Sequence, residues 1–293
     1  MERSFVTKDQ LESTLQSQHT REVQSGRRFE FGKNWKRFLS VVDDSRIMAA
    51  EKALQQMLEV ERLDGKRFLD VGCGSGIFSL AAIRLGAIVH SFDYDPHSIE
   101  CARMLKKRYA PIAPWVIEEA SVLDTTYLHR LGQFDVVYSW GVLHHTGAMW
   151  KALEHVIPLI KSSGKLFIAI YNDQGGVSRR WKTVKRIYNK SPRIVRPFVL
   201  FPVMLYFEGW EMVKQLLRGS NPVEGWVRSK DPRGMHRWYD WIDWVGGYPF
   251  EVAKPEEIFD FYRKRGFVLN RMLTQRGGLG CNEYVFVKPP LSS

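Results

Sequence analysis

The sequence predicts an α/β fold in which a doubly wound, mostly parallel sheet is covered by helices on both faces. Three observations lead to this prediction. An apolar run enters a glycine-rich turn at 68–80, and short apolar segments then alternate with helical patterns up to residue 171. The alternation stops for roughly eighty residues and resumes near residue 254. Strands that alternate with helices form parallel sheets buried on both faces, so the interruption indicates a large insertion.

The glycine-rich turn is the most informative stretch of the chain. Asp70 ends the apolar run, and Gly72, Gly74 and Gly76 follow at every second position. Glycine allows a sharp turn and lets a ligand lie close to the backbone. Dinucleotide-binding loops have the spacing G-x-G-x-x-G, which fits neither register here because positions 77 and 79 are not glycine.

The remaining elements follow from hydrophobic spacing and from helix-capping residues. A helix begins after Asp43, and another begins where Asp95 precedes a proline, which is a typical helix start. The other expected elements are strands at 88–93, 115–117, 134–140, 165–171, 268–274 and 283–287, and helices at 146–160 and 255–265. In a sheet of this kind the ligand lies beyond the carboxyl ends of the strands.

The net charge is the unusual feature of the composition. The 293 residues carry a formal charge of +11, which indicates a nucleic acid, a phosphorylated substrate or an acidic membrane surface, with a solvated basic surface as the alternative. Three cysteines at unrelated spacings argue against a disulfide framework and against a structural zinc site, so no metal is expected. The first residues lack the apolar core of an export signal, and we therefore expect a cytoplasmic protein.

The pattern D-x-G-x-G-x-G at 70–76 resembles the first motif of class I S-adenosylmethionine-dependent methyltransferases. The resemblance covers residues 65–172 and 254–289. It implies a seven-stranded, Rossmann-like methyltransferase fold whose last strand is antiparallel to its neighbour. It also divides the chain into an N-terminal arm (1–42), a cofactor-binding core (43–172), an inserted cap over the acceptor (173–253) and the C-terminal part of the core sheet (254–293).

The resemblance implies S-adenosylmethionine as the cofactor and gives roles to several residues. Asp70 faces the methionine amino group, the three glycines lie against the cofactor, and Asp93 accepts hydrogen bonds from both ribose hydroxyls. Asp124 accepts a hydrogen bond from the adenine amino group, and Trp140 lines the cofactor. Each position also has a structural interpretation: a helix cap for Asp93 or Asp124, and a buried core side chain for Trp140.

Two residues upstream resemble the N-terminal region of ubiquinone-type O-methyltransferases. Trp35 lies in an aromatic segment, and Arg46 follows about eleven residues later at a helix start. In that family an arginine pairs with the methionine carboxylate, which a guanidinium can hold through two parallel hydrogen bonds. The alternative is an ordinary exposed arginine.

A Leu-His-His sequence follows the fourth expected strand and resembles the small-molecule branch of the family. A histidine at this point faces the acceptor, and its near-neutral pKa suits it to accept the acceptor's proton. His144 and His145 are therefore the first candidates for the base, with a purely structural role in the loop as the alternative. The proline-proline motif of nucleobase N-methyltransferases is absent from this position, which counts against methylation of nucleobase amino groups.

The inserted segment has a basic, an apolar and an aromatic part. Residues 161–196 contain ten Lys or Arg and one acid. Residues 198–207 form an apolar run that is too short to span a bilayer, which takes about twenty residues. The run is either a buried cap helix or the apolar face of an interfacial element. Residues 234–250 are dense in aromatics and include His236, a third candidate base. We expect them to lie over the glycine loop as the acceptor pocket, or else to pack on one another as a cap.

The predicted function is methyl transfer from S-adenosylmethionine to a small-molecule acceptor, with oxygen as the acceptor atom by family resemblance alone. The main alternative is an RNA-modifying methyltransferase that uses the basic surface, although the missing proline-proline motif makes a nucleic acid the less favoured partner. A second alternative is a non-catalytic S-adenosylmethionine-binding protein whose insertion docks on a membrane or a partner. An anionic substrate and a peripheral membrane contact both remain compatible with the charge.

Overall fold

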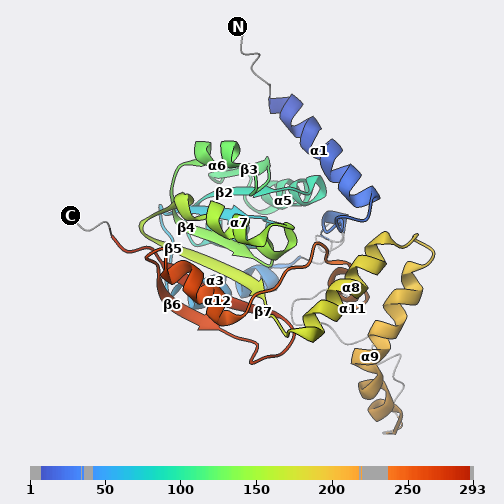
Figure 1. Cartoon of the computed structure of the whole chain (residues 1–293). Coiled ribbons are helices and arrows are strands. Elements are labelled where there is room, and N and C mark those ends of the chain that lie inside the picture. The colour runs from blue at the N-terminus through green and yellow to red at the C-terminus, as the bar shows by residue number, and fades with distance from the viewer. Residues whose placement is uncertain (1–7, 34, 36–41, 218, 220–236, 291–293) are drawn as a thin grey trace.

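The computed structural model describes residues 8–33, 35, 42–217, 219 and 237–290. Its centre is a seven-stranded sheet with the strand order β3-β2-β1-β4-β5-β7-β6 (Figure 1). Adjacent strands are parallel from β3 to β5, whereas β7 is antiparallel to both β5 and β6. The predicted doubly wound fold is confirmed. The strands are β1 (Arg67–Val71), β2 (Ile88–Asp93), β3 (Trp115–Glu119), β4 (Phe134–Trp140), β5 (Ile160–Tyr171), β6 (Val268–Leu273) and β7 (Cys281–Val287).

Helices cover both faces of this sheet. One face is covered by α3 (Asp44–Leu58), α4 (Ile77–Arg84) and α5 (Pro96–Tyr109), and the other by α6 (Thr125–Leu131), α7 (Met149–His155) and α12 (Pro255–Arg263). The helix start predicted at Asp95 is confirmed, because its carboxylate accepts a hydrogen bond from the amide of His97 at 2.9 Å. At the β3 edge, α1 (Lys8–Gln24) contacts the sheet through the side-chain amide of Gln16, which donates a hydrogen bond to the carboxylate of Glu119 at 2.9 Å.

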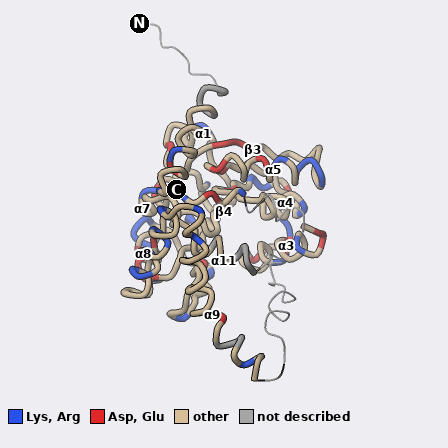
Figure 2. Tube along the Cα trace, turned by 90° about the vertical axis from the view of Figure 1, so that its right-hand side faces the viewer, with Lys and Arg blue, Asp and Glu red and all other residues tan. Residues whose placement is uncertain are grey.

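The insertion leaves the sheet and returns to it at a single point. Asn172, just after β5, pairs with Ala253, and the amide of Asp173 donates to the carbonyl of Ala253 at 3.1 Å. Between these positions α8 (Gly176–Lys190), α9 (Arg196–Leu217) and α11 (Arg237–Gly246) pack on one another beside the sheet. Lys and Arg residues recur along α8, and α9 extends away from the sheet (Figure 2). No helix in the described ranges is long and apolar enough to cross a membrane.

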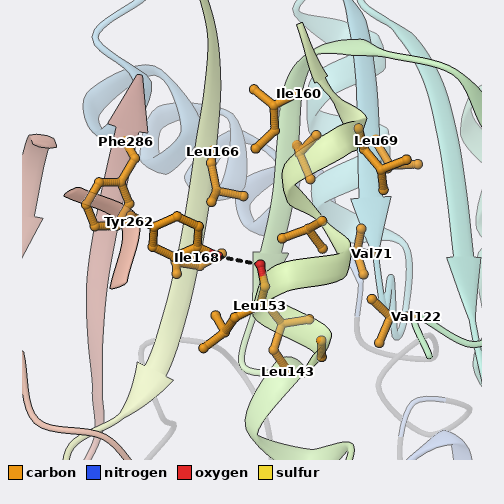
Figure 3. Packing of buried hydrophobic residues seen from close by; sticks show 14 of the residues in the cluster. Leu69, Val71, Val122, Leu143, Leu153, Ile160, Leu166, Ile168, Tyr262 and Phe286 are labelled. Carbon is orange, nitrogen blue, oxygen red and sulfur yellow. Dashed lines mark hydrogen bonds between the residues drawn. The ribbon is translucent and has the colours of Figure 1, made fainter. Parts of the chain in front are cut away.

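The largest apolar cluster lies between the sheet and the helix pair α7 and α12. Leu69 of β1 and Leu166 of β5 pack there with Leu153 of α7 and Tyr262 of α12 (Figure 3). The hydroxyl of Tyr262 donates to the carbonyl of Leu153 at 3.1 Å, so this buried polar group is satisfied. Each large apolar side chain buried in this way contributes about 1.5–3 kcal/mol. The cluster fixes the strands whose carboxyl ends carry the site.

The helix expected at 146–160 is shorter than its hydrophobic spacing predicted. The α-helix ends at His155, and a 3-10 turn, Ile157–Leu159, replaces its last part. Pro158 lies in this turn, where its missing amide hydrogen and its ring prevent the α-helix from continuing. In consequence β5 begins at Ile160, before the expected start, and its pairing with β4 shifts register once before it becomes regular.

Candidate active site

A cavity of about 920 Å³ opens at the carboxyl ends of the parallel strands. Its floor consists of the residues that end or follow β1, β2, β3, β4 and β5. Its walls come from two distant parts of the chain, the N-terminal segment and the insertion. The wall residues include Phe29, Phe31 and Trp35 from the first and Phe207, Trp241 and Trp244 from the second.

The glycine loop brings backbone to the floor of this cavity. Gly72 and Gly74 both line it and both have positive φ, +78° and +53°. A Cβ on Gly72 would lie 2.3 Å from Val142, so a larger residue does not fit without displacing this side chain. The ring of Trp35 covers Gly74, where an added Cβ would come within 3.2 Å of it. Close approach of a cofactor to Gly72 and Gly74 stays a prediction. Gly76 is not among the described residues that line the cavity, and an added Cβ there would lie 3.0 Å from Ala102.

Asp70 lies at the bottom of the floor and is almost completely buried. Its carboxylate accepts a hydrogen bond from the hydroxyl of Ser79 at 2.6 Å, and Ser79 is joined to Ser91 at 2.7 Å. The indole of Trp115 donates to Ser91 at 2.6 Å and completes the network. Burial raises the pKa of Asp70 to about 7, and the nearby charge of Asp93 adds to the effect.

Asp93 ends β2 and is held by two backbone amides. The amide of Gly74 donates to one carboxylate oxygen at 2.9 Å, and the amide of Asp95 donates to the other at 2.8 Å. Burial below the protein surface nevertheless raises the pKa of Asp93 to about 7. Two carboxylates whose ionisation is opposed by burial suit a ligand that brings positive charge and hydroxyl donors. The ammonium, sulfonium and ribose groups of S-adenosylmethionine fit this requirement.

Asp124 lies after β3 at the start of α6. Its carboxylate accepts a hydrogen bond from the amide of Tyr127 at 3.0 Å and so caps α6. Among the described residues the cavity is lined by 120–123 but not by Asp124. These contacts are those of a helix cap, which is the structural interpretation of this acid, and we favour that interpretation over a contact with adenine.

The three other proposed cofactor residues all line the cavity. Trp140, at the end of β4, is partly exposed to it, so Trp140 is not a fully buried core residue. Trp35 contacts the glycine loop. Arg46, at the start of α3, lines the cavity while its guanidinium also pairs with Asp43 at 3.2 Å. Its pairing with a ligand carboxylate stays a prediction.

The two adjacent histidines have different surroundings. His145 lines the cavity, and its Nδ1 lies 2.6 Å from the carbonyl oxygen of Pro249. A carbonyl oxygen only accepts, so Nδ1 carries the hydrogen and Nε2 keeps its lone pair. Burial lowers the pKa of His145 to about 3, which keeps the ring neutral.

His144 lies behind this position and is not among the described residues that line the cavity. It is completely buried, it accepts a hydrogen bond from the amide of Tyr171 at 3.3 Å, and its ring lies 4.1 Å from the Tyr171 ring. Burial holds the pKa of His144 well below its usual range. Its contacts are those of a structural residue that fixes the loop. His236, the third candidate base, lies outside the described residues.

Arg28 and Tyr171 are among the cavity residues that were not predicted from the sequence. Arg28 donates to the backbone carbonyl of His145 at 3.2 Å, pairs with Glu22 at 2.7 Å and lies 4.8 Å over the ring of Tyr94. Tyr171 ends β5 beside both histidine rings. The position of Tyr171 at the end of a central strand could have identified it, because sites lie at such ends. Arg28 precedes an aromatic segment but carries no motif.

The insertion contributes an aromatic wall. Trp241 and Trp244 line the cavity from α11, and Phe207 of α9 stacks on Trp241 at 5.1 Å. The fully buried Lys185 of α8 donates to the carbonyl of Trp244, and Asn189 donates to the carbonyl of Gly246 at 2.7 Å. Both acceptors belong to the last turn of α11, where a lysine also complements the helix dipole. These bonds fasten the wall to α8.

Comparisons with known proteins identify relatives in sequence and in fold. A family model described as a methyltransferase domain matches residues 44–245. The ubiquinone biosynthesis O-methyltransferase of Xanthomonas oryzae pv. oryzae is 32% identical over 113 residues, which are 38% of this chain and 46% of that relative. The protein of the same name from Xanthomonas axonopodis pv. citri is 31% identical over 108 residues, 37% of this chain and 44% of the relative. The chain thus spans less than half the length of these curated relatives.

One solved structure covers the whole chain. It is an O-methyltransferase family protein from Burkholderia thailandensis, with a TM-score of 0.54 and 12% sequence identity, and the match covers 100% of this chain and 74% of that one. At this identity the likeness shows a shared fold.

Proposed function

The chain belongs to the methyltransferase domain family, whose members use S-adenosylmethionine, and we propose that it methylates an oxygen atom of a small, largely apolar acceptor. One observation carries the proposal. The cavity that begins at the glycine loop and Asp93 continues without a break to His145 and to the aromatic wall of the insertion. Two molecules that must react with each other can therefore be held side by side in one continuous cavity.

The floor of the cavity would hold the cofactor. Asp93 would accept hydrogen bonds from the ribose hydroxyls, and Asp70 and the glycine loop would face the methionine end. S-adenosylmethionine supplies the electrophilic methyl group on its sulfonium. The residues of this chain then have to orient the acceptor, exclude water and remove a proton.

The acceptor would lie against the insertion. Trp241, Trp244 and Phe207 offer large apolar surfaces there, which suits a mostly apolar molecule that is oriented by a few polar groups. Oxygen is favoured as the acceptor atom because the curated relatives are named O-methyltransferases. A hydroxyl acceptor also explains why a neutral histidine lies in this wall.

His145 is the proposed base. Its Nδ1–H bond to the Pro249 carbonyl fixes the ring and leaves Nε2 unprotonated, on a residue that lines the cavity. Nε2 can accept the hydroxyl proton while Nδ1–H continues to donate to the carbonyl, which stabilises the imidazolium. Because burial makes that cation unfavourable, the proton would leave His145 for solvent after each methyl transfer, which restores the neutral ring.

The experiment that tests this proposal is a turnover assay with a panel of acceptors. The protein is incubated with S-adenosylmethionine and with phenols, aliphatic alcohols, amines or RNA, and S-adenosylhomocysteine and methylated product are measured by mass spectrometry. We expect turnover with hydroxylated apolar compounds. Turnover confined to amines or to RNA would contradict the proposed acceptor, and binding of S-adenosylmethionine without turnover on any acceptor would favour a non-catalytic role.

A further inference from the structure

The outer side of α9 carries a stripe of exposed apolar side chains. Phe198, Phe201, Leu205 and Tyr206 are 76, 61, 48 and 76% exposed. Their spacing places them on one side of a helix, and the exposed Leu216 continues the stripe toward its end. The apolar run seen in the sequence is therefore only half accounted for by packing inside the chain.

The inner side of the same helix is occupied. Leu200 and Val203 are buried, and Phe207 stacks on Trp181 of α8 at 5.4 Å. A helix that is apolar on both sides is normally covered on both sides. Contiguous exposed apolar surface of this kind marks a site where a protein meets a partner or a membrane.

Positive charge borders the stripe. Residues 174–207 contain eight Lys or Arg and no Asp or Glu. α8 packs directly against α9 and carries most of these charges (Figure 2). The exposed basic side chains on α8 and on the turn that leads into α9 are Arg179, Arg180, Lys182, Arg186, Lys190 and Arg193.

We propose that the outer side of α9, together with the exposed basic side of α8, docks on an anionic lipid bilayer. Apolar side chains on such a helix enter the boundary between headgroups and acyl chains, while Lys and Arg bind the anionic headgroups. The helix lies in the plane of the interface, in keeping with its inability to span a membrane. A second copy of the chain fits this surface less well, because a symmetric contact would bring two acid-free basic segments together.

The docking surface adjoins the cavity. Phe207 belongs to α9 and also lines the cavity, so a bilayer against the outer side of α9 lies one helix away from the aromatic wall. The identity of the methyl acceptor does not affect the docking chemistry, which depends on surface side chains alone.

Vesicle flotation of the full chain tests the proposal. The probes are vesicles of phosphatidylcholine with phosphatidylglycerol and vesicles of phosphatidylcholine alone. We expect the protein to float with the anionic vesicles and to be released by salt. Replacing Arg186, Lys190 and Arg193 together by Gln should weaken binding about fivefold per charge, or roughly a hundredfold. The triple variant Phe198→Ser, Phe201→Ser, Tyr206→Ser should lose about tenfold per aromatic ring.

Matched variants elsewhere on the surface provide the controls. Ile112→Ser with Leu273→Ser removes exposed apolar side chains far from α9, and Arg103, Lys107 and Lys264 replaced by Gln remove three exposed charges from other helices and from a helix end. Both controls should float like the wild type. Calorimetric binding of S-adenosylhomocysteine verifies that every variant is folded.

Three outcomes would overturn the inference. The first is no flotation of the wild type with anionic vesicles. The second is an equal loss of flotation in the α9 variants and in their matched controls. The third is a wild-type dimer, seen by analytical ultracentrifugation, that the α9 aromatic variant dissociates, because the stripe would then belong to a second copy of the chain.

Discussion

The two ends of the cavity are built by opposite means. At the floor, Asp93 is held by backbone amides and the glycine loop is fixed by positive φ angles. At the far wall, Trp241 and Trp244 are held by side chains of α8 and α9. The sheet imposes the geometry of the first end, whereas side-chain packing within an insertion imposes that of the second. The first end therefore suits a constant ligand, and the second can change with the acceptor.

This difference predicts that substitutions at one end leave binding at the other end unchanged. The contacts that hold the floor and those that hold the aromatic wall involve mostly different residues, and mutational effects at separate sites are usually additive.

The sharpest contrast is expected between the adjacent histidines. His145→Ala should reduce turnover by about 10²–10⁴-fold, the contribution of a general base, and leave S-adenosylmethionine affinity within a few-fold. His144→Ala removes a buried acceptor for the amide of Tyr171 and should cost about 1–3 kcal/mol of stability instead. Turnover, calorimetry and denaturant unfolding distinguish the two. Full activity of a protein lacking both imidazoles would move the base elsewhere, with His236 next.

The two aspartates after neighbouring strands offer a second contrast. Asp93→Ala should weaken S-adenosylmethionine binding by about 1.5–3 kcal/mol, because hydrogen bonds to a charged acceptor are lost. Asp124→Ala should leave that affinity unchanged and lower stability by about 1 kcal/mol, as for the loss of a helix cap. Titration calorimetry of both variants measures the difference, and NAD should give no binding signal with the wild type. Equal affinities of the two folded variants would refute the role of Asp93.

The sequence predicted the residues at the floor of the cavity better than those at the aromatic wall. Asp70, Asp93 and the glycines could be placed from their spacing, because the parallel sheet brings the ends of its strands to one edge whatever the side chains are. Asp124 satisfied the same spacing but caps a helix, and spacing alone does not distinguish a cap from a ligand contact. The helix expected at 146–160 is shorter in the structure, because Pro158 prevents the α-helix from continuing although the apolar spacing does continue.

For the aromatic wall, the sequence predicted only that the segment is rich in aromatic residues. Residues 234–250 were recognisable as aromatic, but which of them meet the cavity depends on Lys185 and Asn189, more than fifty residues upstream. Arg28 could not be found for the same reason, since its partners His145 and Tyr94 are brought to it by folding. Long-range contacts between side chains leave no periodic trace in a sequence.

Removing the hydrogen bond that joins α8 to α11 tests whether the aromatic wall can move without affecting cofactor binding at the floor. Lys185→Met should make α11 easier to open by about 1.5–3 kcal/mol, the value of a hydrogen bond from a charged donor. Hydrogen exchange at residues 241–246 should accelerate while S-adenosylmethionine affinity stays constant. Lys182→Met, an exposed lysine on the same helix, is the matched control and should change neither. Loss of cofactor affinity in the Lys185 variant would show that the two ends are coupled.

The smallest effect concerns pH. Burial raises the pKa values of Asp70 and Asp93 to about 7 in the protein without ligand. A positively charged ligand lowers the pKa of a neighbouring acid, so binding releases protons. Affinity for S-adenosylmethionine should be constant above about pH 7 and fall as the pH drops below it, by at most about tenfold per pH unit for each acid. Calorimetry across this range should show a shallower slope in Asp93→Asn, and an affinity that rises toward acid would contradict the assignment.

We propose that cofactor and acceptor meet between the glycine loop and the aromatic wall. A crystal structure of the full chain with S-adenosylhomocysteine tests this arrangement. We expect the ribose on Asp93, the homocysteine part along the glycine loop toward the side of His145, and Trp241 and Trp244 closing the same cavity. A ligand bound away from Asp93, or an α11 that lies far from the glycine loop in the complex, would contradict it.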